Sequence, residues 1–258
     1  MESQLSLTAL QIELFWEDKK KNFHHLERQI EQLPATDVII LPEMFTTGFT
    51  MEAEKFAENM DGKTVQWLKE LAYKKQVAIG GSTIIKENNN IFNRFLLVSP
   101  SGKIQHYDKR HTFTLAGENK AYTTGKNNGI VTYKDWKICL RVCYDLRFPV
   151  WGRNTSDYDL LIYTANWPHK RIAVWDTLLK ARAIENMTYC VGVNRIGTDG
   201  SNLTYPGHTT VFNHMGDCIG ETTEHKPGST TVLLDKDAML LARKKLNFLN
   251  DRDQFTLH

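Results

Sequence analysis

The chain has 258 residues, 41% of them apolar and 24% charged, and its formal net charge is +2. These values are ordinary for a globular enzyme with one domain over residues 1–258. They give no reason to expect nucleic acid or an anionic membrane as a partner. No apolar run approaches the ~18–20 residues that a membrane span needs.

The cysteines and the first residues bear on the compartment. The N-terminus lacks the basic, apolar and small-residue pattern of an export signal and resembles a first strand. The chain contains four cysteines, Cys139, Cys143, Cys190 and Cys218. Without such a signal, they predict reduced thiols and a cytoplasmic location.

Apolar periodicity predicts a mixture of helices and strands. In the first half, helices are expected over 18–33 and 64–75, and a continuous apolar run over 37–41 indicates a strand buried on both faces. Further strands are expected over 77–84, 92–98 and 103–107. In the second half we expect a hairpin near 134–136 and strands over 138–142, 160–164, 189–194, 208–213 and 228–235, with helices over 171–187 and 237–245.

These elements do not follow a strict alternation of strand and helix. Hairpins lie between the helices, and Met215-Gly216-Asp217 indicates one more hairpin turn. The pattern therefore favours an α/β fold of two mixed sheets whose outer faces are covered by helices.

Three of the predicted strands are each followed by one reactive side chain. Glu43 follows 38–41, Lys109 follows 103–107, and Cys143 follows 138–142. Ligands in α/β proteins bind at the carboxyl ends of strands. A thiol, a carboxylate and an ammonium brought together there would serve as nucleophile, proton shuttle and oxyanion clamp, which is the equipment for attacking a carbon–nitrogen bond.

Cys143 stands apart from the other cysteines, which we interpret as small buried hydrophobic residues. The apolar pattern ends at Cys143, and the backbone N–H of Tyr144 could face an anion there. A partner must take the thiol proton, because the thiolate is the nucleophile. Cys139 and Cys143 fit neither a redox pair nor a zinc site, and no histidine pair has metal-ligand spacing, so no metal is predicted.

Each of these signals is weak alone, but together they resemble the three signature blocks of the nitrilase, or carbon–nitrogen hydrolase, superfamily. The blocks are 41–45 (LPEMF), 107–111 (YDKRH) and 142–149 (VCYDLRFP), and the match continues through 165–168 (ANWP) and 181–186 (ARAIEN). Within the superfamily, Arg147-Phe148-Pro149 resembles the ω-amidase type, which hydrolyses the terminal amide of dicarboxylic monoamides such as 2-oxoglutaramate.

The resemblance implies a four-layer α-β-β-α sandwich, usually assembled as a homodimer, and a Glu-Lys-Cys triad. Glu43 would act as base and then as acid, Cys143 would form a thioester, and Lys109 with the backbone N–H of Tyr144 would stabilise the oxyanion. A second carboxylate, Glu118, would hold the lysine. No metal or organic cofactor is implied, and the partners are a small amide and water.

The same resemblance suggests which residues meet the substrate. Arg147 could bind the far carboxylate, or it could instead pair internally with Asp145 or Glu185. Phe45, Asn166 and Trp167 are expected to shape the pocket.

Two alternatives remain open at this stage. Another reaction of the superfamily, on a nitrile, an aliphatic amide or an N-carbamoyl group, or acyl transfer, would use the same triad. A binding or scaffold protein on the same fold would have lost its chemistry, although the intact Glu43, Lys109 and Cys143 count against that interpretation.

Overall fold

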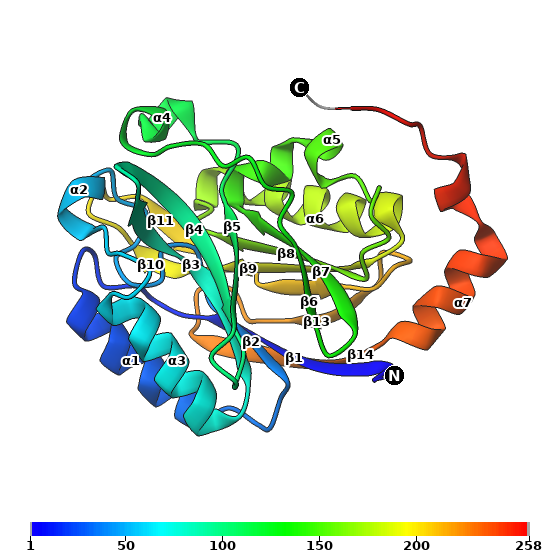
Figure 1. The fold of residues 1–258 in the computed structure, drawn as a ribbon, viewed down its shortest axis with the longest axis horizontal. Helices are drawn as coiled ribbons and strands as arrows, with labels where there is room; N and C mark the ends of the chain where they lie inside the picture. Colours follow the sequence, from blue (N-terminus) through cyan, green and yellow to red (C-terminus); the bar gives the residue numbers. More distant parts are fainter. Residues whose placement is uncertain (1, 257–258) are drawn as a thin grey trace.

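The computed structural model describes residues 2–256, which form two six-stranded sheets packed face to face between layers of helices (Figure 1). The first sheet has the order β14-β1-β2-β3-β4-β5 and the second the order β13-β12-β9-β8-β7-β6. In sequence order the first sheet contains β1 (Gln4–Gln11), β2 (Val38–Ile40), β3 (Ala78–Glu87), β4 (Asn90–Val98), β5 (Ile104–Asp108) and β14 (Gly228–Asp235). The second contains β6 (Ile130–Tyr133), β7 (Trp136–Val142), β8 (Leu160–Ala165), β9 (Tyr189–Asn194), β12 (Thr210–Phe212) and β13 (Cys218–Glu221).

Both sheets are mixed, as the sequence predicted. Strands β1, β2 and β3 run parallel in the first sheet, and β7, β8 and β9 run parallel in the second. The remaining strands pair antiparallel at the edges. The four-layer sandwich expected from the resemblance is therefore confirmed.

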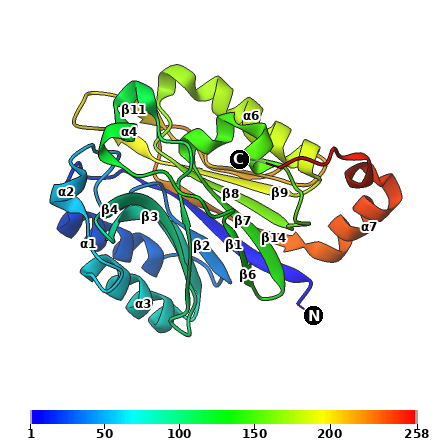
Figure 2. The same cartoon turned by 45° about the horizontal axis from the view of Figure 1, so that its top comes forward.

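Helices cover the two outer faces of the sandwich (Figure 2). Helices α1 (Lys19–Glu31) and α3 (Lys63–Lys75) pack on the first sheet through residues such as Leu26 and Leu68. Helix α6 (Ile172–Asn186) packs on the second sheet through Trp175 and Leu179. The helical spacing of these apolar residues is what turns one face of each helix toward its sheet.

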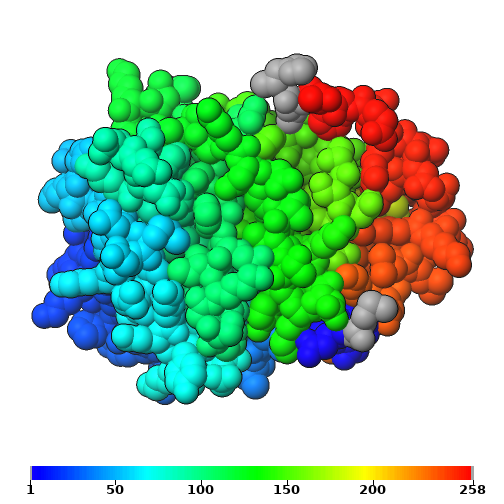
Figure 3. All heavy atoms as spheres, viewed as in Figure 1, coloured from blue at the N-terminus to red at the C-terminus, as the bar shows by residue number. Residues whose placement is uncertain are grey.

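A shared core lies between the sheets, and strand β2 shows why its apolar run is continuous. Val38 and Ile40 face the second sheet, while Ile39 faces the helices, so both faces of the strand are buried. In Figure 3 the residues of α1 to β3 (blue to cyan) lie on one side of the visible face, and the C-terminal residues around α7 (orange to red) lie on the opposite side. No helix in the described range 2–256 has the length and apolar character to cross a membrane.

Several short elements were not predicted. They are the helices α2 (Ala53–Phe56), α4 (Glu118–Ala121) and α5 (Pro149–Gly152), the small hairpin of β10 (Ile196–Thr198) and β11 (Thr204–Pro206), and the 3-10 turns η1 (Thr114–Ala116), η2 (Cys143–Arg147), η3 (His169–Arg171) and η4 (Phe248–Asp251). The predicted final helix is α7 (Lys236–Leu246), which lies at the edge of the sandwich (Figure 1).

The strand directions bring the reactive residues to one end of the molecule. Because β5 is antiparallel to β4 and β4 is antiparallel to β3, β5 runs in the same direction as β2. Glu43 and Lys109 thus follow strands that end at the same edge of the first sheet. Cys143 and Asn166 follow the parallel strands β7 and β8 of the second sheet.

Candidate active site

Cys143 occupies a strained turn between β7 and η2. Its φ angle is +44°, a left-handed conformation that costs a non-glycine residue about 1–3 kcal/mol and persists only where the surrounding structure imposes it. The Sγ atom lies 4.0 Å from the carbonyl oxygen of Asn166. Because Cys143 begins η2, the first N–H groups of this turn, including that of Tyr144, have no acceptor within the turn.

Asp145 fastens this turn to the segment that carries the lysine. Its Oδ2 accepts hydrogen bonds from Val142 N (3.0 Å) and from the Tyr107 hydroxyl (2.8 Å). Its Oδ1 accepts from His111 N (3.1 Å) and lies 2.8 Å from His111 Nδ1. Sequence reasoning considered Asp145 only as a partner for Arg147. No local pattern indicates this contact, because Asp145 and His111 lie 34 positions apart in the chain.

Lys109 is buried between two carboxylates. Its Nζ lies 3.0 Å from Glu43 Oε1 and 2.9 Å from both carboxylate oxygens of Glu118. Burial alone would lower the pKa of Lys109, but the charges of Glu118 and Glu43 raise it. Burial raises the pKa of Glu118. The lysine is therefore held as an ammonium, at a fixed position, by the two carboxylates.

Glu43 is oriented from both sheets. Its Oε1 accepts a hydrogen bond from Asn93 Nδ2 (2.8 Å), in the middle of β4, and its Oε2 accepts one from the backbone N–H of Asn166 (2.9 Å). Asn93 was not predicted; the sequence signal is the polar pair Asn93-Arg94 between the apolar residues of β4. The Asn166 side chain also donates to the Glu43 carbonyl (2.7 Å).

Phe45 does not line the site, contrary to the expectation from the sequence. Met44 has a φ of +44°, so the chain reverses directly after Glu43 and carries Phe45 back into the core. The Phe45 ring has no exposed surface and packs 6.0 Å from Trp67 of α3. Phe49, four residues later, occupies the cavity wall instead and places its ring 5.2 Å from Lys109 Nζ.

The ionisation of Cys143 is controlled by its surroundings. Burial raises the pKa of the Cys143 thiol well above its usual range, the charge of Glu43 raises it further, and Lys109 opposes both. The resting nucleophile is therefore a protonated thiol, and its proton must leave as it attacks.

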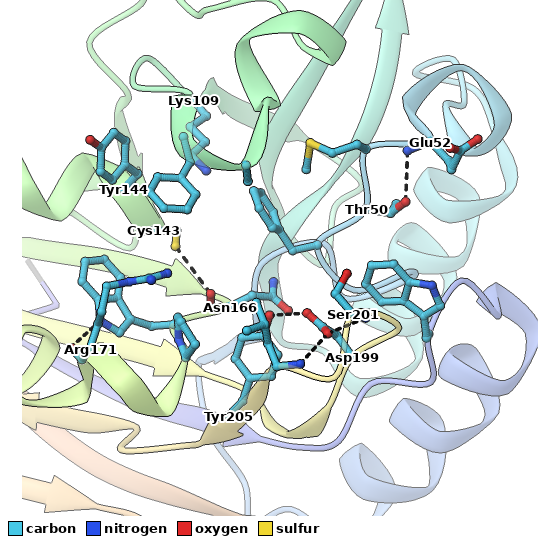
Figure 4. A pocket seen from close by; sticks show the side chains of 18 of the residues that line it. Thr50, Glu52, Lys109, Cys143, Tyr144, Asn166, Arg171, Asp199, Ser201 and Tyr205 are labelled. Carbon is cyan, nitrogen blue, oxygen red and sulfur yellow. Dashed lines mark hydrogen bonds between the residues drawn. The ribbon is translucent and has the colours of Figure 1, made fainter.

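A cavity of about 440 Å³ opens over the thiol (Figure 4). Cys143 and Lys109 line it, together with six aromatic side chains. The aromatic lining residues are Trp16, Phe49, Phe113, Tyr144, Trp167 and Tyr205. A cavity of this size and character suits a small, partly apolar molecule.

Two arginines line the same cavity. Arg147 lies over the Trp167 ring at 5.2 Å, and Arg171, which was not predicted, lies over the Phe113 ring at 5.3 Å. Neither internal partner considered for Arg147 is available, because Asp145 is occupied as described and Glu185 pairs with Arg182 at 3.0 Å. Within residues 2–256 no carboxylate pairs with Arg147, so its guanidinium is free to meet an anion.

Comparison with known proteins places this geometry in a family. The family model described as carbon–nitrogen hydrolase matches residues 6–244. The chain belongs to this family. The hydrolase is 43% identical over 253 residues to "Omega-amidase YafV" of Escherichia coli (strain K12), a match that covers 98% of each protein. It is 31% identical over 222 residues to "2-oxoglutaramate amidase" of Bacillus subtilis (strain 168), a match that covers 84% of this chain and 85% of that protein.

Solved structures agree with this assignment. A carbon–nitrogen hydrolase superfamily protein of Xanthomonas campestris, solved with an arsenic adduct in its active site, superposes on the hydrolase with a TM-score of 0.96. The two are 38% identical, and the match covers 99% of each chain. The superfamily resemblance drawn from three short blocks is thus confirmed over almost the whole chain.

Proposed function

We propose that the hydrolase is an ω-amidase, which cleaves the terminal amide of a dicarboxylic monoamide such as 2-oxoglutaramate to the free acid and ammonia. The observation that carries the substrate class is the unpaired guanidinium of Arg147 on the wall of the cavity that holds Cys143. Arginine binds carboxylates through two parallel hydrogen bonds. The named relatives support the same reaction.

In the proposed first half-reaction, Glu43 accepts the thiol proton as Cys143 Sγ attacks the amide carbon. The carbonyl oxygen becomes an oxyanion, which Lys109 and the backbone N–H of Tyr144 stabilise. Collapse of this intermediate breaks the carbon–nitrogen bond, and Glu43 returns its proton to the departing nitrogen. The products are ammonia and a thioester on Cys143.

In the second half-reaction, water is the nucleophile and the Cys143 thiolate is the leaving group. Glu43 accepts a proton from water, the resulting hydroxide attacks the thioester carbon, and the same two donors stabilise the second oxyanion. Collapse of this intermediate expels the Cys143 thiolate. Glu43 then returns its proton to the thiolate, which restores the enzyme. Glu118 keeps Lys109 in place throughout, because both of its oxygens bind Nζ. Side chains and water carry every step, so the proposal includes no cofactor.

We further propose that the hydrolase works as a homodimer in a reducing, cytoplasmic compartment. The mechanism needs Cys143 as a free thiol, which such a compartment maintains. For the dimer, Val150, Phe248 and Phe255 are exposed and line a common groove beside α5, an apolar surface that a second copy could bury. Phe248→Asp should convert a dimer to monomers in analytical ultracentrifugation.

The reaction is tested by measuring ammonia release from 2-oxoglutaramate, glutamine, pentanamide and a nitrile. We expect preferential turnover of 2-oxoglutaramate and no turnover by Cys143→Ala. Activity on the nitrile or on pentanamide alone would retain the nucleophile and contradict the dicarboxylate substrate. No activity on any of the four would favour another acyl acceptor or a scaffold protein.

The carboxylate contact is tested separately with Arg147→Met. Loss of a charged hydrogen-bonding partner should lower kcat/KM for 2-oxoglutaramate by about 10- to 100-fold. Pentanamide has no carboxylate, so its turnover should change far less. Arg28→Met, on the exposed face of α1, is the matched control. An equal loss on both substrates would mean that Arg147 shapes the site without binding the anion.

A further inference from the structure

A cluster of histidines lies outside the catalytic cavity. His169 begins η3, and Glu224 and His225 lie in the loop between β13 and β14. One ligand atom from each of the three falls within 4.8 Å of the others, and within residues 2–256 no other group of three such side chains meets this condition. All three are exposed, and the rings of His169 and His225 stack with centroids 5.8 Å apart.

A third histidine faces the same carboxylate. His208 Nε2 lies 3.5 Å from Glu224 Oε1, and His225 Nε2 lies 3.3 Å from the same oxygen. The His208 Nε2 atom is buried and has no hydrogen-bond partner among residues 2–256. We call His169, His208, Glu224 and His225 the histidine cluster. Its four members come from three separate segments of the chain.

The second nitrogen of His208 is already committed. Its Nδ1 lies 3.1 and 3.0 Å from the two carboxylate oxygens of Asp176 on α6, so Nδ1 carries a proton and donates it there. In a neutral ring the lone pair is then on Nε2, which points toward the Glu224 oxygen. Two acceptors facing each other at 3.5 Å repel unless a proton or a metal cation lies between them.

This pattern is the one that metal-bound histidines adopt. A ligating imidazole commonly donates its other N–H to a carboxylate, which fixes the ring and its tautomer. Imidazole nitrogens combined with one carboxylate suit zinc and its neighbours among the transition metals rather than magnesium or calcium. We propose that the histidine cluster binds a zinc-class divalent cation through His169, Glu224 and His225, with His208, whose Nε2 lies 3.5 Å from Glu224, as the side chain that could complete the set.

The spacing allows such a site after a small contraction. Ligands of a tetrahedral zinc at ~2.0–2.1 Å lie about 3.4 Å from one another. The three exposed side chains can move from their present separation of up to 4.8 Å because they are not confined by the core. Binding would replace any proton held between His208 and Glu224, so the bound metal should release protons.

The cluster lies behind one wall of the catalytic cavity. His169 and His225 line a groove of about 500 Å³, and Tyr205 borders both this groove and the catalytic cavity. His169 also shares η3 with Arg171, which Figure 4 shows at the cavity wall with Tyr205. A bound ion would therefore join the loop before β14 to the segment that positions Arg171. The inference does not depend on which amide the hydrolase cleaves.

The test uses Cys143→Ala/Cys218→Ser, because zinc binds thiolates and both cysteines are accessible to some degree. The chelator-treated protein is titrated with Zn²⁺ by calorimetry, and Co²⁺ serves as a spectroscopic probe of coordination geometry. We expect one saturable site per chain, proton release on binding, and the intense visible absorption of tetrahedral Co²⁺.

Variants made in the same background locate the site. His169→Ala/His225→Ala should weaken zinc binding by at least ~100-fold, whereas the matched double variant His24→Ala/His106→Ala, at exposed histidines of α1 and β5, should bind like the parent. Asp176→Asn should weaken binding by about 10- to 100-fold through His208 alone. Absence of saturable binding would overturn the proposal and leave His208 as a protonated partner of two carboxylates. Equal binding by both double variants would also overturn it.

Discussion

Glu43 has two opposing relations to Cys143 in the proposed mechanism. It is the group that removes the thiol proton, yet its negative charge contributes to raising the pKa of that thiol in the resting enzyme. The two effects have different readouts, because loss of the base appears in the rate and loss of the charge appears in the thiol pKa. Glu43→Gln preserves the shape of the side chain and removes both the base and the charge.

We expect Glu43→Gln to lower the pKa of Cys143 while abolishing most of the activity. Burial still raises the pKa, but the repulsion from Glu43 is gone and Lys109 continues to favour the thiolate. The loss of a general base should cost about 100- to 10,000-fold in kcat. The thiol pKa is measured from the pH dependence of alkylation by iodoacetamide and from the ultraviolet absorbance of the thiolate.

The control for this measurement is Glu54→Gln, which removes a carboxylate that pairs with Lys86 at the surface. It should leave both the thiol pKa and the activity unchanged. A thiol pKa that stays constant or rises in Glu43→Gln would show that the carboxylate charge does not act on Cys143.

Single residues differ in how far the sequence could predict them. Glu43 and Cys143 each follow an apolar run, and Lys109 follows the more polar predicted strand over 103–107, so each position can be recognised from one segment. Asn93 and Arg171 become part of the site only because β4 and η3 contact other segments in the folded chain. For the histidine cluster, the donors are spread from residue 169 to residue 225, so no local spacing indicates it.

At the scale of elements, the turn after β7 and the segment after β5 are joined through Asp145. Burial alone would raise the pKa of Asp145, but the hydrogen bond from His111 and the charge of Arg141 lower it. A carboxyl with a lowered pKa in the folded state contributes stability above its unfolded pKa of ~3.9, and this contribution is lost as the pH falls through the folded pKa.

We therefore expect Asp145→Asn to lower the free energy of unfolding by about 1–3 kcal/mol at neutral pH, because the amide cannot accept all four contacts. The difference from the wild type should shrink as the pH falls below ~4, where the carboxyl of the unfolded chain becomes protonated first, and should vanish below the lowered pKa of the folded state. Urea unfolding at neutral and acidic pH measures both values. A difference that does not change with pH would mean that the contacts do not depend on the charge of Asp145.

Elements with long apolar patterns were predicted to within a few residues, and short ones were missed for a common reason. Helices α1, α3 and α6 have enough turns for their periodicity to be recognised. Helix α4 has four residues and is held mainly by contacts of Glu118 with Lys109 and with Phe113 N. Its position depends on distant partners, which periodicity does not report.

At the scale of the whole molecule, each sheet supplies part of the site and neither buries its inner face without the other. Glu43, Lys109 and Glu118 follow strands of the first sheet, and Cys143 and Asn166 follow strands of the second. Leu97 of β4 and Ile162 of β8 belong to the one core that lies between the sheets. The first and the last long strands, β1 and β14, pair with each other, so segments distant in the chain belong to the same sheet.

This arrangement predicts a single cooperative unfolding transition for residues 1–258, in which structure and activity are lost together. Leu97→Ala and Ile162→Ala each remove a buried side chain from opposite sides of the shared core and should each cost about 2–5 kcal/mol of unfolding free energy.

Urea transitions are followed at several protein concentrations by tryptophan fluorescence, far-ultraviolet circular dichroism and residual activity. Trp67 in α3, Trp136 between the sheets and Trp175 in α6 report different layers. In each variant all three midpoints should shift by the same amount, since a change in either sheet destabilises the common core. If Leu97→Ala shifted only part of the fluorescence change and left a second transition in place, the sheets would be separate domains and the active site would lie between them.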